Sequence, residues 1–206
     1  MSEAVLKTKR DLRREQILKI AGEVFMEEGF AVASMSAIAA RLGGSKGTLY
    51  NYFESKEDLL EAFVRDCCLS FWDRVFSFAG EDLPVRELLV NVGESYLKQL
   101  DEDVVRFVRM LIGEAQRIPE LTRIFYDTGP RAKALRLADY LEAAKARGEF
   151  EAEDCKAAAR QFLALVRGAF YFERLLNVND PDDQAAARAE IKASVDLFLK
   201  AYPPRG

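Results

Sequence analysis

The run from Ser45 to Phe53 places hydrogen-bonding side chains at helical spacing. Leu49 and Phe53 are four residues apart, so they are expected to share one face of a helix and to pack inward. The remaining side chains are small, polar or hydrogen-bonding: Lys46, Gly47, Tyr50 and Asn51 face outward, with Thr48 and Tyr52 at the edges. The run contains no acid and so does not repel phosphate. Ammonium, hydroxyl and amide groups of this kind contact phosphates and base edges of duplex DNA.

A second short helix is expected immediately before this run. The hydroxyl of Ser34 can cap the helix that follows it, in which Ile38 and Leu42 recur at a spacing of four. Gly43–Gly44 then ends that helix, because glycine adopts the left-handed conformation of a sharp turn without a Cβ penalty. Residues 34–53 therefore predict a helix-turn-helix, the motif that holds its second helix in the major groove of DNA.

This segment resembles the DNA-binding domain of TetR-family transcriptional regulators. The resemblance is carried by Ser34, Ile38-Ala39, Gly43, Ser45-Lys46-Gly47-Thr48-Leu49-Tyr50, Tyr52-Phe53 and Ser55-Lys56-Glu57-Asp58-Leu59-Leu60. Two positions depart from the family pattern. Leu42 stands where alanine is common, and Gly44 replaces an aliphatic residue of the turn, so a looser turn is expected.

The rest of the chain predicts an all-α fold. Ile17, Ala21, Val24 and Phe25 form an apolar stripe that would complete a three-helix DNA-binding domain over residues 1–56. Residues 57–206 are expected to form a helical bundle for effector binding and dimerisation. A long fourth helix is expected from Ser55 to about Phe78, ended by Gly80, and a later one from Asp154 through Phe170. Further helix starts are predicted after Asp101–Asp103 and at four prolines, Pro84, Pro119, Pro130 and Pro181.

Charge is distributed unevenly. The chain carries a net charge of −4, which alone disfavours binding to a polyanion, but residues 1–56 hold nine basic and seven acidic side chains. Lys7, Lys9, Arg10, Arg13 and Arg14 are predicted to form a basic arm that contacts phosphate beside the second helix of the motif. A solubilising tail is the alternative interpretation.

The hypothesis assigns DNA contacts residue by residue. Ser45 and the backbone N–H groups of Lys46 and Gly47 would bind phosphate, and Thr48 would offer its hydroxyl or methyl to a base. The full set assigned to DNA is Ser34, Ser45, Lys46, Gly47, Thr48, Tyr50, Asn51, Tyr52, Lys56 and Arg13.

Dimerisation is expected through two late helices. Residues 162–172 are apolar almost all round, so a helix there must be covered on both sides, and TetR-like regulators pair through their last two long helices. The predicted interface comprises Phe162, Leu165, Gly168, Ala169, Ile191, Val195 and Phe198. Burial within a single chain is the alternative.

A weaker resemblance, to AefR-like carboxy-terminal domains, is carried by residues 106–126 together with Gly148, Asp154 and the run 158–168. Such domains usually enclose an effector pocket. The aromatic and methionine side chains that could line one are Trp72, Phe76, Tyr96, Phe107, Met110, Tyr126, Phe162 and Tyr171. For each of them a place in the ordinary core is the alternative.

Composition argues against an enzyme. The chain has no histidine, which removes the commonest general base and most zinc sites. Its three cysteines have no metal-ligand spacing, so no catalytic residue, metal or cofactor is predicted. Without an apolar targeting or membrane segment, a cytoplasmic location is expected. The sequence therefore predicts a homodimeric repressor that binds a palindromic operator in double-stranded DNA and is released by a small molecule. A protein-binding module with non-specific DNA affinity is the alternative.

Overall fold

The computed structural model describes residues 8–77, 83–178 and 184–203, and within these ranges every regular element is a helix. The predicted all-α fold is therefore confirmed. The chain divides into two compact units, which are described separately. Unit 1 comprises Met1–Cys67 and Met110–Phe125, and unit 2 comprises Cys68–Arg109 and Tyr126–Gly206.

The helices of the first half are α1 (Lys9–Glu28), α2 (Met35–Arg41), α3 (Lys46–Tyr50), α4 (Lys56–Val75) and α5 (Val85–Gln99). Those of the second half are α6 (Glu102–Glu114), α7 (Pro119–Tyr126), the π-helical turn η1 (Asp127–Arg131), α8 (Ala132–Ala146), α9 (Cys155–Leu176) and α10 (Gln184–Ala201). None of these helices is long and apolar enough to cross a membrane.

In unit 1, α1 begins earlier than the sequence indicated. Thr8 and Asp11 form a reciprocal capping box, in which the Asp11 N–H donates to Thr8 Oγ1 and the Thr8 N–H donates to Asp11 Oδ2. The predicted basic arm is therefore wrong from residue 9 onward, because Lys9–Arg14 form the first turns of a helix. Lys7 lies outside the described residues.

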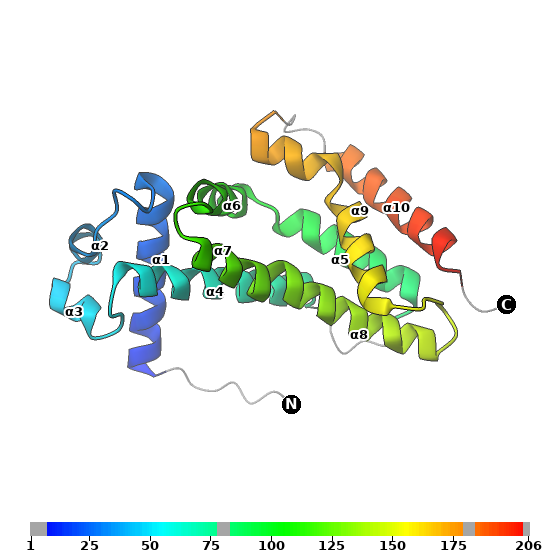
Figure 1. Ribbon diagram of the computed structural model, residues 1–206, viewed down its shortest axis with the longest axis horizontal. Coiled ribbons are helices and arrows are strands. Elements are labelled where there is room, and N and C mark those ends of the chain that lie inside the picture. The colour runs from blue at the N-terminus through cyan, green and yellow to red at the C-terminus, as the bar shows by residue number, and fades with distance from the viewer. Residues whose placement is uncertain (1–7, 78–82, 179–183, 204–206) are drawn as a thin grey trace. The chain divides into compact units, whose positions relative to one another are not determined.

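The core of unit 1 forms where α1, α2, α3 and the start of α4 bury their apolar stripes. Ile17, Phe25, Ile38 and Leu49 are fully buried, and Figure 1 shows α2 and α3 together beside α1. Gly22 of α1 faces the Phe63 ring so closely that an added Cβ would lie 2.2 Å from the nearest ring carbon. Glycine at this position lets α1 and α4 pack at short range.

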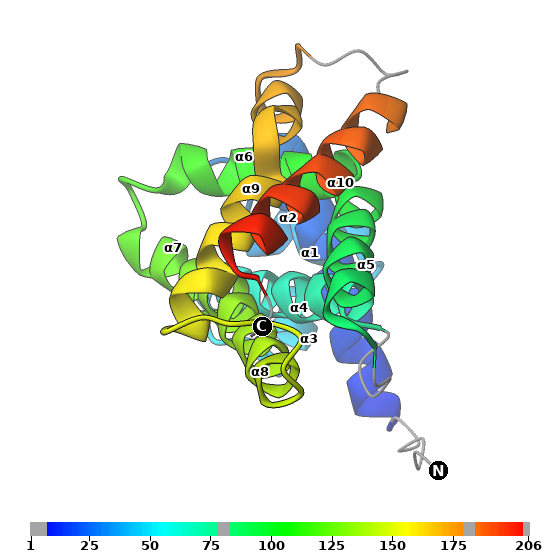
Figure 2. The same ribbon diagram turned by 90° about the vertical axis from the view of Figure 1, so that its right-hand side faces the viewer.

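In unit 2, α9 packs against both α8 and α10, and α10 also packs against α5. Figure 2 shows α10 running obliquely across α9. Phe198 of α10 sits at the centre of this contact, with its ring centroid 5.2 Å from that of Phe162 and 5.7 Å from that of Phe150. All three rings are buried, so they form the interior of the unit.

The prolines mark helix starts in two of the three predicted places that the structure describes. Helix α5 follows Pro84 and α7 begins at Pro119, as expected. Pro130 does not start a helix: it lies inside η1, through which the helical chain continues from α7 into α8. A π turn already interrupts the i→i−4 hydrogen-bond ladder, so proline's missing N–H is tolerated there. Pro181 and Gly80 lie outside the described residues.

Two helix ends also differ from the prediction. Helix α4 ends at Val75 rather than near Phe78. Helix α9 begins after Asp154, whose side chain accepts from the N–H groups of Lys156 and Ala157, but it continues to Leu176 and is broken internally at Gly168 (φ 48°, ψ −163°). The break divides α9 into two helical segments, which the sequence pattern did not predict.

Candidate DNA-binding site and bundle cavity

The turn between α2 and α3 is held by two backbone hydrogen bonds. The N–H of Gly43 donates to Ala40 O and that of Gly44 to Ala39 O, each at 3.1 Å, and Gly43 has φ 69°. This pairing is a Schellman motif, a standard helix C-terminus. The expected loosening of the turn is therefore wrong, because the backbone bonds define it without a side chain at position 44.

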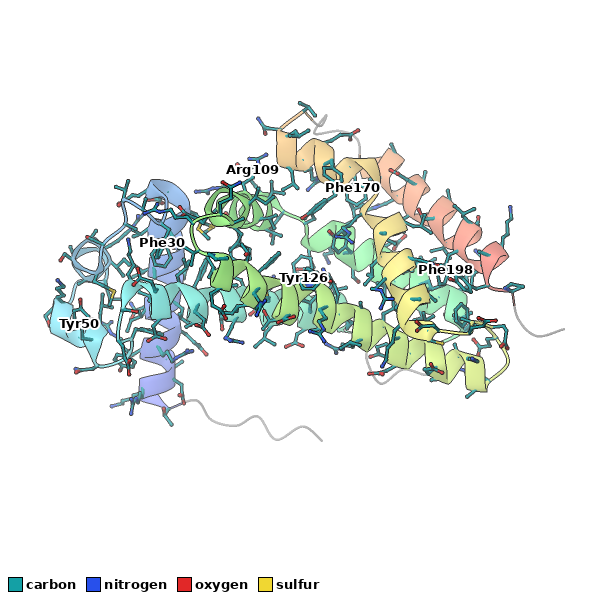
Figure 3. The ribbon with its side chains drawn as sticks, in the orientation of Figure 1. Phe30, Tyr50, Arg109, Tyr126, Phe170 and Phe198 are labelled. Atoms are coloured by element: carbon teal, nitrogen blue, oxygen red, sulfur yellow. The ribbon has the colours of Figure 1, made fainter. Side chains whose placement is uncertain are left out.

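Helix α3 presents the face that the sequence predicted. Ser45 Oγ accepts from the Thr48 N–H at 3.2 Å and lies 3.0 Å from Thr48 Oγ1, which fixes the first turn. Leu49 and Phe53 are buried. The exposed residues, here called the α3 face, are Lys46, Gly47, Tyr50 and Asn51, with Thr48 and Tyr52 half-buried beside them. Tyr50 is 47% exposed, and Figure 3 shows it on α3.

Arginines of α1 lie along the edge of the α3 face. The guanidinium carbon of Arg10 is 5.8 Å from the Tyr52 ring centroid, and that of Arg14 is 5.3 Å from the Phe53 centroid. Arg13 donates to Gln16 Oε1, and its Nη2 lies 3.4 Å from where a Cβ on Gly44 would be. The basic residues thus border α3 by packing from a helix rather than by reaching from an arm.

Two of the residues assigned to DNA make structural contacts instead of facing outward freely. Ser34 Oγ accepts from the Ala37 N–H at 3.1 Å, which caps α2. Lys56 Nζ donates to Phe30 O at 2.7 Å and to Ala33 O at 2.9 Å, and it lies 4.3 Å from the Phe30 ring centroid. Because these contacts use two of its three N–H groups, Lys56 ties α4 to the loop before α2 and does not fit the predicted role of a free phosphate anchor.

Unit 2 contains a cavity of about 700 Å³, a size typical of small-molecule sites. Its walls come from α5, the η1 region, α8 and α9. The lining residues are Tyr96, Tyr126, Pro130, Arg131, Lys133, Ala134, Leu135, Lys156, Arg160, Leu163, Val166 and Arg167.

Only two of the eight predicted pocket residues, Tyr96 and Tyr126, line this cavity. Phe76 stacks on Tyr140 and Phe162 packs on Phe198, so both belong to the core. The other four, Trp72, Phe107, Met110 and Tyr171, are also absent from the lining.

The basic lining residues were missed by sequence reasoning. A signal exists for one of them: Lys133, which is half-buried, lies four residues before the buried Leu137, whereas Arg167 is exposed. A charged residue on the buried stripe of a helix needs a polar environment, and here the cavity supplies it for Lys133.

The predicted dimer interface requires a correction. Phe162, Ile191, Val195 and Phe198 are at most 1% exposed, so their surface is already covered by their own chain. Leu165 and Gly168 are half-buried, and the Ala169 side chain lies outside the described set. The exposed apolar residues of α9 and α10 include Ala164, Phe172, Leu176, Ala189, Ala193 and Leu197.

A capped helix-turn-helix with an acid-free outer face, bordered by arginines, defines a DNA-binding protein of the helix-turn-helix class. Comparison with known families agrees. Residues 17–63 match the model of bacterial regulatory proteins of the tetR family, and residues 87–204 match that of the AefR-like transcriptional repressor C-terminal domain. The chain belongs to the TetR family of transcriptional regulators.

Individual relatives extend over nearly the whole chain. An uncharacterised HTH-type transcriptional regulator, YdgC of Bacillus subtilis, is 27% identical and covers 98% of each chain. The solved structure of the flavonoid-responsive regulator FrrA is 36% identical, covers 95% of this chain and 99% of its own, and has a TM-score of 0.79. A putative TetR-family regulator from Mesorhizobium loti shares the fold, with a TM-score of 0.86 over 95% of this chain and 99% of its own at 24% identity.

Proposed function

We propose that this DNA-binding transcriptional regulator is a homodimeric, ligand-responsive repressor that binds a palindromic operator and leaves it when a small molecule occupies the bundle. The observation that carries the proposal is the α3 face: an exposed, acid-free set of hydrogen-bonding groups on a helix held by a Schellman turn. A major-groove helix needs this combination of a fixed entry angle and free polar side chains.

The α3 face and its neighbours offer two kinds of DNA contact, to phosphates and to base edges. Ser45 and the first N–H groups of α3 would meet phosphate, while Thr48, Tyr50, Asn51 and Tyr52 would share base edges and backbone. Arg13 of α1, whose guanidinium lies near Gly44, would add a phosphate contact beside the turn. Lys56 would support binding indirectly, by holding the loop before α2 against α4.

Dimerisation is proposed through the outward faces of α9 and α10. Phe172, Leu176 and Leu197 are 65%, 70% and 57% exposed on these two helices, which leaves apolar surface that a partner subunit could cover. Alanines at positions 189 and 193 would allow a partner helix to approach closely. A two-fold dimer would place two α3 faces on the two half-sites of a palindrome.

Effector binding is proposed in the unit 2 cavity, within the bundle over residues 57–206. Its volume of about 700 Å³ suits a small molecule, and the similar protein FrrA is described as flavonoid-responsive. A molecule that binds the cavity in only one conformation of the bundle would shift the population of DNA-competent dimers by its differential affinity.

Selection of bound fragments from random DNA, repeated in the presence of a small-molecule library, tests the whole proposal. We expect one palindromic sequence, bound about 10³-fold or more tightly than random DNA at fixed salt, and loss of binding with at least one compound. Binding that depends steeply on salt and shows no sequence preference would contradict an operator and favour non-specific DNA binding.

A further inference from the structure

Among the described residues that line the unit 2 cavity, several are cations and none is a carboxylate. Five of its lining residues are basic, namely Arg131, Lys133, Lys156, Arg160 and Arg167. A protein cavity with an excess of one charge attracts a ligand of the opposite charge, because the low-dielectric walls strengthen the interaction. The question is which of these cations lack a partner of their own.

Three of the five have a carboxylate nearby. Arg131 Nη1 lies 3.2 Å from Asp127 Oδ1 within η1. Lys156 and Arg160 are close enough to the Asp154 carboxylate to lower its pKa, after the larger effect of the backbone N–H groups that it caps. Arg131 is therefore paired, and Lys156 and Arg160 share the single negative charge of Asp154.

The remaining two, Lys133 and Arg167, have no carboxylate partner among the described residues. Arg167 Nε donates to Leu163 O of its own helix at 3.3 Å, which leaves the outer guanidinium N–H groups available. Lys133 Nζ lies 3.4 Å from the Trp72 ring centroid and 5.8 Å from that of Tyr96. An ammonium held by aromatic faces keeps its N–H groups for another acceptor.

The two cations also affect each other. Burial, and then the charge of Arg167, holds the pKa of Lys133 well below its usual range. Burial raises the pKa of the Tyr96 phenol, which therefore stays neutral beside them. An anion placed between Lys133 and Arg167 would offset the like-charge repulsion and favour the ammonium form of Lys133.

From this arrangement we infer that the cavity binds a small organic anion, a carboxylate or phosphate whose charged group lies between Lys133 and Arg167 and whose apolar body contacts Leu163, Val166 and the Tyr96 ring. The inference rests on the proposed effector function and names its ligand class. Guanidinium and ammonium groups both form charge-assisted hydrogen bonds with such oxygens, and the apolar wall excludes small hydrated ions.

The test uses the full-length protein and matched compounds that differ in charge alone. The probes are benzoate, 2-naphthoate and octanoate, each against its amide, and 1-naphthyl phosphate against 1-naphthol, with binding measured by calorimetry. We expect an anion to bind more tightly than its uncharged partner. The inference would be overturned if the uncharged compounds bind as tightly as, or more tightly than, every anion. It would also be overturned if none of the anions binds.

Two variants test whether Arg167 binds the charged group of the ligand. Arg167→Gln is expected to weaken binding of the preferred anion by about 10- to 100-fold, the range of a hydrogen bond to a charged group. The affinity for the uncharged partner compound should stay unchanged. The matched control is Arg136→Gln on α8, because Arg136 pairs with Asp73 and lies over the Phe76 ring outside the cavity lining. Equal losses in both variants would contradict the assignment.

Proton uptake provides a second readout. The groups facing Lys133 are Trp72, Tyr96, Arg167 and the Cys68 thiol; none of them is a carboxylate, and the charge interaction with Cys68 is the smallest of the effects on the pKa of Lys133. Binding of an anion should therefore raise the pKa of Lys133 and take up a proton. Affinity should fall as pH rises through the window between the free and bound pKa values. Calorimetry in two buffers of different ionisation enthalpy should detect the proton, and Lys133→Met should abolish it.

The operator assay separates the two proposals. Anion binding without operator release would refute the effector function and leave the ligand class intact. Operator release by uncharged compounds alone would refute the ligand class and leave the effector function intact.

Discussion

Tyr50 is the side chain whose role in DNA binding is easiest to separate from folding, because its ring is 47% exposed while the adjacent Leu49 is fully buried. Tyr50→Ala should weaken operator binding by about 10- to 100-fold, the range expected for loss of a specific contact. Stability should change by less than about 0.5 kcal/mol. A gel shift at fixed salt, with thermal denaturation and sedimentation as controls, measures both, and unchanged DNA affinity would exclude Tyr50 from the interface.

Lys56 should behave in the opposite way. Lys56→Met removes the donor to Phe30 O and Ala33 O and should destabilise the protein by about 1–3 kcal/mol, the cost of leaving partly buried carbonyls unpaired. Denaturant unfolding measures this loss. Lys46→Met is the matched control, because Lys46 is exposed on the α3 face. The stability of the Lys46→Met protein should be unchanged, while its affinity for DNA should fall. Equal stability of both variants would contradict the structural role of Lys56.

At the residue scale, the sequence predicted what depends on local chemistry. The caps Ser34 and Ser45 and the inward pair Leu49 and Phe53 follow from spacing within a few residues, and the structure confirms all four. The contact of Lys56 with Phe30 O joins residues 26 positions apart. No spacing rule reports such a contact, because it depends on how the helices pack.

At the scale of elements, the break of α9 at Gly168 predicts how a substitution there changes the stability of the protein. With φ 48° this backbone is accessible to glycine and strained for other residues, so Gly168→Ala should cost about 1 kcal/mol or more. Gly113 of α6 is the control: an added Cβ there meets nothing within 4 Å, and Gly113→Ala should stabilise by about 0.5–1 kcal/mol. Thermal denaturation of the two variants should show shifts of opposite sign, and a stabilised Gly168→Ala would mean that α9 is continuous.

Helix boundaries were predictable where a residue acts within its own helical turn. Pro84 and Pro119 start helices because proline suits a first turn, and Asp154 caps α9 through its own carboxylate. The prediction for Pro130 was wrong because proline is also tolerated inside a helical segment where the hydrogen-bond ladder is already interrupted. The two situations have the same local sequence signal, so only the packing of the bundle distinguishes them.

At the scale of the whole molecule, the outward face of α10 makes a prediction about assembly. Leu197→Glu places a charge on the proposed dimer face and should convert dimer to monomer, as measured by sedimentation equilibrium. Operator affinity should fall with it, because one α3 face then binds alone. Leu69→Glu on α4, at a similar exposure of 60%, is the control and should remain dimeric. A dimeric Leu197→Glu variant would move the interface elsewhere.

The dimer face also shows the limit of sequence reasoning at this scale. Residues 162–172 are apolar nearly all round, which predicted two covered sides but not which residue belongs to which side. Phe162 turned inward to Phe198, whereas Phe172, beyond the break at Gly168, faces outward. The helical wheel failed because it assumes a continuous helix, and α9 is not one.

The contact between Lys133 and Trp72 has an optical consequence. Trp72 is the single tryptophan of the chain, so all indole fluorescence comes from one ring, and Lys133 Nζ lies 3.4 Å from its centroid. Indole emission is quenched and shifted by a nearby charge, so a change in the protonation or position of that ammonium alters the spectrum. The protein therefore carries a built-in reporter in contact with a residue that lines its cavity, which allows occupancy to be followed in solution without a label.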